Sequence, residues 1–381
     1  MGKKIFYLLI ILFLCVSTKA YAISDEQTSV DISKLESFAQ SLQQEVDYLP
    51  EISFSKMIES YKKNGSLGIT VKDFTNSLLK FMFKEILLNS KLLVELLFIG
   101  IFCALLQNIQ NAFSDDGVSK IAYYACFLVM VVVIIKSFST AVQLGQRTIS
   151  NMVEFMNSLM PPLIVLIAAV GGFASAATLD PIVMFILKVT SDIIRDLVLP
   201  LTILVVVINI VDNLSDSIKI SKLGGLIKQV SLWVLGFIMT IFVGIVTIRS
   251  NASATIDQVA LKSAKFAVDN FIPIVGKCLS DAITTVAGYS LVLKDAISIG
   301  GLLVMIFICV FPLIKIIILA LIYKFVGAVM EPVVDKRIVD CLSATGSSLT
   351  MIFICVLSVA IMFFIMITIV ASTGKLVMMV G

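Results

Sequence analysis

The chain has 381 residues, of which 59% are hydrophobic and 14% are charged, and its formal net charge is +3. Soluble domains usually carry about 25% charged residues, so this composition excludes an ordinary soluble fold. The net charge is too small to indicate nucleic-acid binding. Histidine is absent and none of the seven cysteines forms a CxxC pair. The sequence therefore predicts no metal site, no cofactor, and neither a hydrolytic nor a redox enzyme.

Residues 1–22 have the features of a cleavable signal peptide. Lys3 and Lys4 form a short basic start, and the apolar stretch Ile5–Val16 is too short to span a membrane. Ala20 and Ala22 then form a small-x-small cleavage site. Cleavage after Ala22 would place the mature N-terminus outside the cytoplasm, and an uncleaved signal anchor is the alternative.

Residues 23–85 are more polar and are predicted to form a small helical extracytoplasmic region. Apolar residues at helical spacing indicate a first helix: Ile32, Leu35, Phe38 and Leu42. Further helices are predicted over 52–61 and from Val71 onward. A region this small buries little apolar surface, so we expect it to dock on the membrane part or on a partner.

The remaining chain is predicted to be a polytopic all-α membrane domain, with a first half over 86–250 and a second half over 251–381. Six apolar stretches are strong candidates for spans: Leu92–Leu106, Ile121–Ile135, Leu197–Val211, Leu232–Ile248, Leu302–Tyr323 and Met351–Val370. An amphipathic helix is predicted over Asn251–Asn270. Two further segments bring the expected number of membrane segments to between six and eight.

Proline and glycine interrupt these two further segments. The interruptions are at Pro161, Pro162, Gly171 and Gly172 in the first, and at Pro273 and Gly276 in the second. Interrupted backbone at membrane depth is tolerated only where protein or water covers it. We therefore expect broken or re-entrant helices. The alternatives are an ordinary kinked span for the first and a surface-lying amphipathic helix for the second.

A possible internal repeat follows from proline spacing. Pro161 and Pro273 differ by 112 positions, as do Pro200 and Pro312, which are expected to break two of the spans. Repeats of this kind are common in secondary transporters, so a transporter of a small solute or ion is an alternative function.

Basic loops predict the orientation, because Lys and Arg concentrate on the cytoplasmic side. Two such loops are predicted to be cytoplasmic: one with Lys219, Lys222 and Lys228, the other with Lys324, Lys336 and Arg337. The link around 111–120 would then also be cytoplasmic, and the C-terminus would be outside.

Charged residues near membrane depth are the candidate functional residues. Lys188, Asp192, Arg195 and Asp196 share one helical face, and their charges sum to zero, so they can pair along the helix. Lys277 and Asp281 are an i,i+4 pair beside the second interruption, and Lys315 lies inside a span, where a charge is costly. These residues predict a polar path or a subunit interface; interfacial snorkelling and structural pairing are the alternative.

Several short motifs follow one another along the chain in an order typical of a known family. They include Lys262-Ser263-Ala264-Lys265-Phe266, Phe271-Ile272-Pro273-Ile274-Val275-Gly276, Ala174-Ser175-Ala176-Ala177, Phe311-Pro312-Leu313-Ile314-Lys315 and Glu331-Pro332. In number and order they resemble the stage III sporulation protein AE family of spore-forming Firmicutes. The resemblance covers most of residues 90–375 and the signal peptide.

The resemblance implies a role in endospore formation. Family members belong to a channel or export complex that is made in the mother cell and sits in the membrane around the forespore. The implied partners are the other membrane, ring and ATPase components of that complex, with self-association also possible, and the implied role is to sustain late forespore gene expression. No catalytic residue carries over from the family.

Overall fold

The computed structural model is all-α over the residues that it describes. These are 53–64, 71–112, 117–214, 219–271 and 276–373, with a few positions between Ser33 and Gln40, and no strand occurs among them. The helices are α3 Phe54–Asn64, α4 Val71–Ala112, α5 Gly117–Ala169, α6 Asp180–Ile193, α7 Leu199–Leu214, α8 Ser221–Phe271, α9 Gly276–Met330 and α10 Lys336–Ser372, with the π-helices η1 Ser175–Leu179 and η2 Ile194–Val198 flanking α6. The predicted fold class is confirmed. The predicted cleavage site at Ala20 and Ala22 lies outside the described residues.

Six helical rods in the described part are long and apolar enough to cross a membrane: Thr75–Ile109, Ile121–Ala169, Pro181–Leu214, Ser221–Arg249, Thr285–Met330 and Lys336–Ser372. Each of the six strong predicted spans falls inside one rod, so the chain is a multi-pass membrane protein. The rods are longer than a bilayer requires. The 53 residues of α5 measure about 80 Å at 1.5 Å per residue, whereas the hydrocarbon core is about 30 Å thick. The longest helices therefore extend beyond it.

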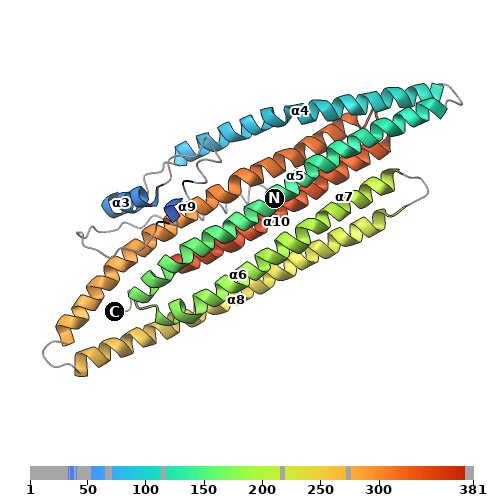
Figure 1. The fold of residues 1–381 in the computed structure, drawn as a ribbon. Coiled ribbons are helices and arrows are strands. Elements are labelled where there is room, and N and C mark those ends of the chain that lie inside the picture. Colours follow the sequence, from blue (N-terminus) through green and yellow to red (C-terminus); the bar gives the residue numbers. More distant parts are fainter. Residues whose placement is uncertain are drawn as a thin grey trace.

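Successive rods run in opposite directions along one elongated bundle. Figure 1 shows α5, α9 and α10 in the middle and α4 along one side. The continuous rod formed by α6, η2 and α7, called the α6–α7 rod below, lies with α8 along the other side. At one end of the bundle α4, α7 and α9 end and α5, α8 and α10 begin, and at the opposite end α5 and α8 end and α6 and α9 begin. The helix ends that flank the three links predicted to be cytoplasmic therefore share one end of the bundle. The region boundaries predicted from the sequence, at 85/86 and 250/251, lie inside α4 and α8.

Pro161 and Pro162 do not break a helix, which corrects the sequence-based prediction. Both lie inside α5; tight packing against neighbouring helices makes such prolines tolerable in membrane proteins. The chain reverses after α5 instead, at Gly171 and Gly172. Gly171 has a φ of 96°, which glycine adopts without the steric cost of a side chain.

Pro200 and Pro312 are also accommodated within helices, so they are not breaks. Pro200 is the second residue of α7, and Pro312 lies inside α9. Gly276 is the first residue of α9, while Pro273 falls outside the described residues, in the link 272–275.

The two stretches that the repeat would align differ in fold, which argues against the repeat. Between Pro161 and Pro200 the chain reverses direction at the α5–α6 turn. In the corresponding stretch of the second half, one continuous helix, α9, runs from Gly276 through Pro312.

Two aspartates bind backbone N–H groups at the starts of α8 and α10. Asp212, near the end of α7, accepts hydrogen bonds from the backbone N–H groups of Ile220 (2.6 Å) and Ser221 (2.8 Å), where α8 begins. Asp335 caps α10 by accepting from the N–H of Arg337 (2.8 Å), and it also accepts from the side chain of Gln107 on α4 (2.8 Å). Capping satisfies backbone donors that a helix start leaves open.

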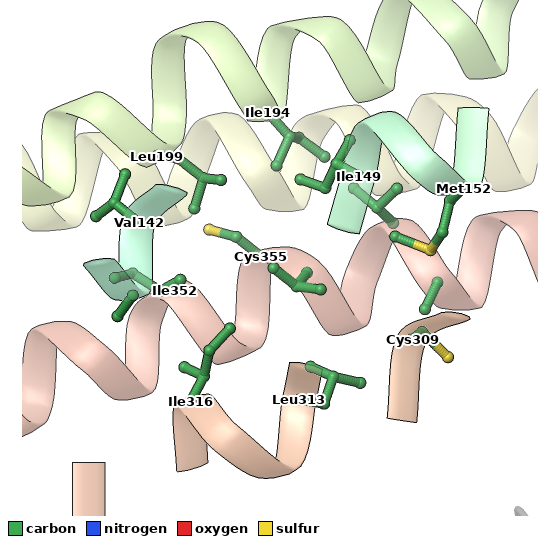
Figure 2. Packing of buried hydrophobic residues seen from close by; sticks show 14 of the residues in the cluster. Val142, Ile149, Met152, Ile194, Leu199, Cys309, Leu313, Ile316, Ile352 and Cys355 are labelled. Carbon is green, nitrogen blue, oxygen red and sulfur yellow. The ribbon is translucent and has the colours of Figure 1, made fainter. Parts of the chain in front are cut away.

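The apolar core lies where α5, α9 and α10 meet the α6–α7 rod. Figure 2 shows its centre, with Val142, Ile149, Met152, Ile194, Leu199, Cys309, Leu313, Ile316, Ile352 and Cys355. The five described cysteines are free, and four of them are buried. A buried thiol packs as a small apolar group.

A close helix crossing joins α9 and α10 at Gly346, and it gives a first testable prediction. A Cβ there would lie 3.1 Å from the carbonyl oxygen of Ala320 and 2.8 Å from Cγ of Lys324. Gly346→Val should therefore lower the free energy of unfolding by ~1–3 kcal/mol, as overpacking does. Gly236→Val is the control, because a Cβ at Gly236 has no such neighbour within 4 Å. Thermal unfolding of both proteins in detergent tests this; equal melting temperatures would contradict the close crossing.

Candidate functional site

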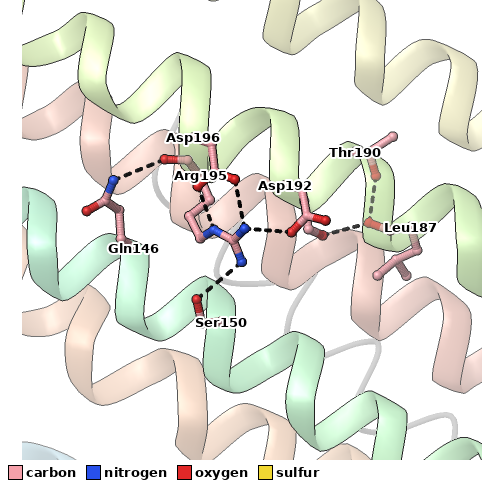
Figure 3. A network of polar contacts seen from close by, with 8 residues as sticks. Gln146, Ser150, Leu187, Thr190, Asp192, Arg195 and Asp196 are labelled. Atoms are coloured by element: carbon pink, nitrogen blue, oxygen red, sulfur yellow. Dashed lines mark hydrogen bonds and ion pairs between the residues drawn. The ribbon is translucent and has the colours of Figure 1, made fainter.

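A network centred on Arg195 brings together three of the predicted charged residues (Figure 3). The guanidinium of Arg195 donates two parallel hydrogen bonds to the carboxylate of Asp196, at 2.8 and 2.7 Å. It also pairs with Asp192 at 2.9 Å and donates to Ser150 on α5 at 3.4 Å. A bidentate contact of this kind fixes the relative orientation of the two side chains and also strengthens their interaction.

The centre of the network lies in the π-helix η2. Arg195 and Asp196 belong to this five-residue π-helix, which begins directly after α6. The side-chain amide of Gln146 on α5 donates to the backbone carbonyl of Arg195 at 3.2 Å. Single π turns in α-helices are frequent at functional sites, and here the turn ties the network to α5.

The network lies on the outside of the bundle. The side chains of Asp192, Arg195 and Asp196 are 36%, 26% and 61% exposed. They lie within the apolar rod Pro181–Leu214. Mutual pairing lowers the cost of these charges but leaves a charged surface on a membrane helix.

Lys188 does not join this network, which corrects the prediction that all four charges pair. Within the described part of the chain, its ammonium has no hydrogen bond or ion pair, because Asp192 binds Arg195 instead. Lys188 lines a surface groove between α5 and α6.

The other predicted charges lie elsewhere. Lys315 on α9 is half-buried, and its Nζ is 5.8 Å from the ring centroid of Phe81 on α4, a cation–π distance. Lys277 and Asp281 belong to the first turns of α9, and their side chains lie outside the described residues.

A second cluster, which we call the capping cluster, is buried at the opposite end and consists of Arg249, Asp257, Lys294 and Thr373. Asp257 on α8 is 1% exposed. Its carboxylate accepts from the N–H of Ala174 (2.8 Å), the N–H of Ser175 (3.4 Å) and the hydroxyl of Ser175 (2.5 Å). A side chain from another helix thus caps the start of η1.

Two cations of the capping cluster bind the end of α10. Lys294 is fully buried on α9; its ammonium donates to the carbonyl of Ala371 at 2.7 Å and to that of Thr373. Arg249 on α8 donates to the hydroxyl of Thr373 at 3.3 and 3.4 Å. Asp295 also lies beside Lys294, at 3.4 Å.

Helix electrostatics explain why these charges are tolerated in the interior. The first turn of a helix carries partial positive charge and the last turn partial negative charge. The carboxylate of Asp257 meets a helix start, and the cations Lys294 and Arg249 meet a helix end. Each of these three charges is therefore opposed by a helix terminus of opposite sign, and the cluster joins α8 and α9 to the end of α10 and the start of η1.

The small helix α3 docks beside the capping cluster. Phe54 packs at Gly300 on α9, where a Cβ would lie 3.3 Å from the phenyl ring. Its backbone N–H donates to the carboxylate of Glu36 at 2.8 Å. Burial raises the pKa of the Tyr61 phenol, and the charge of Asp295 raises it further. Tyr61 therefore stays neutral next to the cluster.

Sequence reasoning missed the capping cluster. Lys294-Asp295 stands out as a charged pair six residues before a predicted span, and Arg249 directly follows one. Nothing in the local sequence connects them with Asp257 or with the end of α10, because the contacts join residues 77 to 124 positions apart.

Comparison with known proteins assigns the family. The sequence profile of the family described as Stage III sporulation protein AE matches residues 52–374. A relative from Bacillus subtilis (strain 168), named Stage III sporulation protein AE, is 33% identical over 331 residues, which cover 87% of this chain and 82% of the relative. No solved structure matches the chain. The match spans the helical bundle, the Arg195 network and the capping cluster, and the chain belongs to the stage III sporulation protein AE family.

Proposed function

We propose that this chain is the polytopic membrane component of a channel or export complex that links mother cell and forespore. Family membership gives it a role in sporulation, and its six apolar rods make it a multi-pass membrane protein. In this proposal it has no enzymatic activity of its own. Its partners are the other membrane, ring and ATPase components of the complex, and its role is to sustain late forespore gene expression and spore maturation.

In the proposed orientation, the end with the two basic links faces the mother-cell cytoplasm. Lys222 and Lys336 lie at this end of the bundle, beside two of the links, and basic residues favour the cytoplasmic side. The α5–α6 and α8–α9 links, the docked helix α3 and the capping cluster would then face the space between the two membranes, in the mother-cell-derived membrane around the forespore.

The observation that carries the proposal of a larger assembly is the exposed Arg195 network. Asp196 is 61% exposed within a rod that is long and apolar enough to cross a membrane. Charged side chains in membrane helices face protein or a water-filled cavity, because contact with lipid tails is costly. A partner subunit or a wet path between subunits would meet this requirement.

A secondary transporter remains the alternative function. Its support is the internal repeat together with the charged residues near membrane depth, and the stretches 161–200 and 276–312, which the repeat would align, differ in fold. A transporter should bind its solute without partners. A channel component should instead copurify with ring and ATPase proteins when a tagged chain is isolated from sporulating cells. Isolation of the chain alone, with a bound solute, would contradict the channel proposal.

The Arg195 network gives a second prediction. Arg195→Gln should reduce the count of heat-resistant spores by at least about tenfold at unchanged protein level, because two carboxylates then remain on the proposed interface. The double variant Arg195→Gln with Asp192→Asn should recover part of the count, since it removes one of those charges. Arg147→Gln, an exposed arginine on α5, is the matched control. Normal sporulation of the single variant would count against the proposed interface.

A further inference from the structure

One face of α5 is polar over a length greater than the thickness of a bilayer. Between Ile135 and Val165, where every residue of α5 is described, no large hydrophobic side chain is exposed. This stretch, residues 136–164, measures about 44 Å at 1.5 Å per residue, whereas the hydrocarbon core of a bilayer is about 30 Å thick. Its exposed polar residues, which we call the α5 strip, are Lys136, Thr140, Gln143, Arg147, Glu154 and Asn157.

The residues of the α5 strip lie on one side of the helix. They follow one another at intervals of three, four or seven positions, and half-buried Ser150 fills the longest interval. A pattern with a mean period of 3.5 residues keeps its side chains on one face of a helix in a bundle. The Arg195 network borders the strip, because Arg195 donates to Ser150 at 3.4 Å (Figure 3). The strip and the network therefore form one polar surface.

The α5 strip is level with the apolar span of α8 along the bundle axis. A Cβ at Gly145 on α5 would lie 3.4 Å from Leu199 on α7, and a Cβ at Gly224 on α8 would lie 3.2 Å from Ile208 on α7. Leu199 and Ile208 are nine positions apart on a helix that runs antiparallel to both α5 and α8. Gly224 is therefore level with a residue about nine positions before Gly145, at the start of the strip.

Exposed apolar residues lie on both flanks of the bundle at this level. On α8, Trp233 is 70% exposed, and on α4, Phe83 and Leu87 are 66% and 72% exposed. A Cβ at Gly100 on α4 would lie 3.8 Å from Met130 on α5. Because α4 and α5 run in opposite directions, Phe83 and Leu87 are level with the middle of the strip. These flanks are suited to lipid, so the strip lies at membrane depth.

The surface of α5 is apolar before and after the strip. Val132 precedes it and is 65% exposed, and Val165 follows it and is 61% exposed. The whole stretch belongs to the rod Ile121–Ala169, which is long and apolar enough to cross a membrane. The strip is therefore a polar interval within an apolar surface.

We propose that the α5 strip forms one wall of a water-filled path through the membrane. Polar and charged side chains at membrane depth face protein or water, because contact with lipid tails is costly. Lys136 and Arg147 are positive and Glu154 is negative, so the strip has no ring of one sign that would select ions by charge. Such a wall suits water and small hydrophilic solutes of either charge.

This inference rests on the proposed function, and it adds the place where the path runs. The other members of the proposed assembly complete the wall. The wall requires polar side chains and not one particular charge, so Arg147→Gln keeps it wet.

Cysteine labelling in membrane fragments from lysed sporulating cells tests the path, because both faces of the membrane are then open to the reagent. The full-length variants Gln143→Cys and Glu154→Cys report on the strip, and Trp233→Cys and Val243→Cys are matched controls at the same levels of α8. The reagent is a membrane-impermeant, cationic methanethiosulfonate, and mass spectrometry of the labelled peptides separates each site from the native cysteines. The strip cysteines should react at least about tenfold faster than the controls, because the reagent attacks the thiolate and a thiol in lipid stays protonated.

Two results would overturn the path. Slow reaction at all four positions would show that protein or lipid covers the strip. Fast reaction at all four positions would show that the strip and the matching part of α8 both lie in water outside the membrane. Copurification of ring and ATPase proteins from the same membranes tests the complex separately, so a dry strip in an intact complex would overturn the path alone.

Discussion

Replacing Lys294 by methionine should destabilise the protein more than any other single change described here. Methionine keeps a similar length and apolar stem but removes the ammonium group that binds the carbonyls of Ala371 and Thr373. Lys294 is fully buried, so water cannot replace these hydrogen bonds. Removing one partner of a buried charged contact typically costs ~3–5 kcal/mol, which is a large share of the stability of most proteins.

The measurement is thermal unfolding of the purified chain in detergent, together with its level in cells. Lys294→Met should lower the melting temperature markedly and reduce the amount of protein by degradation. Lys262→Met is the matched control, because Lys262 is an exposed lysine on α8, toward the same end of the bundle. A Lys294→Met protein as stable as this control would show that the end of α10 is held by its apolar packing alone.

Helices and spans were predictable because their signal is local. Each predicted span is a continuous apolar stretch, and the structure places every one inside a long rod. The amphipathic helix predicted over Asn251–Asn270 is confirmed as the second part of α8. Its continuity with the preceding span, without a break after Arg249, was not predictable from apolar stretches alone.

The proline positions show where local rules fail. Proline lacks an N–H and disfavours a helix interior, which predicted breaks at Pro161 and Pro162. In a bundle, the packing of α5 against several neighbours outweighs the loss of two helical hydrogen bonds. The chain reverses after α5 through a residue with a positive φ. The glycine at position 171 was visible in the sequence as a signal for this turn.

The candidate sites were predictable in part. The i,i+4 and i,i+3 spacing correctly placed Asp192 and Arg195 on one face, where they pair. The spacing could not show that Asp192 binds Arg195 in preference to Lys188, because both cations lie about one helical turn from Asp192 on the same face. The capping cluster depends on the tertiary meeting of α8, α9 and the end of α10, which no local pattern reveals.

Replacing Asp257 by alanine should detach the α5–α6 turn from α8. Three donors, the N–H groups of Ala174 and Ser175 and the hydroxyl of Ser175, lose their acceptor at once. Loss of a capping side chain alone costs ~1 kcal/mol, and up to ~2. Here the side chain is 1% exposed, so buried donors are left open as well. The negative charge that acts on Arg249 also disappears.

Hydrogen exchange distinguishes this local effect from general unfolding. Asp257→Ala should raise the hydrogen exchange of backbone amides in residues 173–179. The amides of α10, apart from those of its last turn, should stay protected, because the core contacts of α10 do not involve Asp257. Asp257→Asn should show an intermediate effect, since the amide keeps one oxygen acceptor but loses the charge that favours a helix start. Glu154→Ala removes an exposed carboxylate of α5 and should leave exchange in 173–179 unchanged. Unchanged exchange there in Asp257→Ala would mean that Gly171 and the packing of α6 hold the turn, and that the carboxylate serves only to balance Arg249.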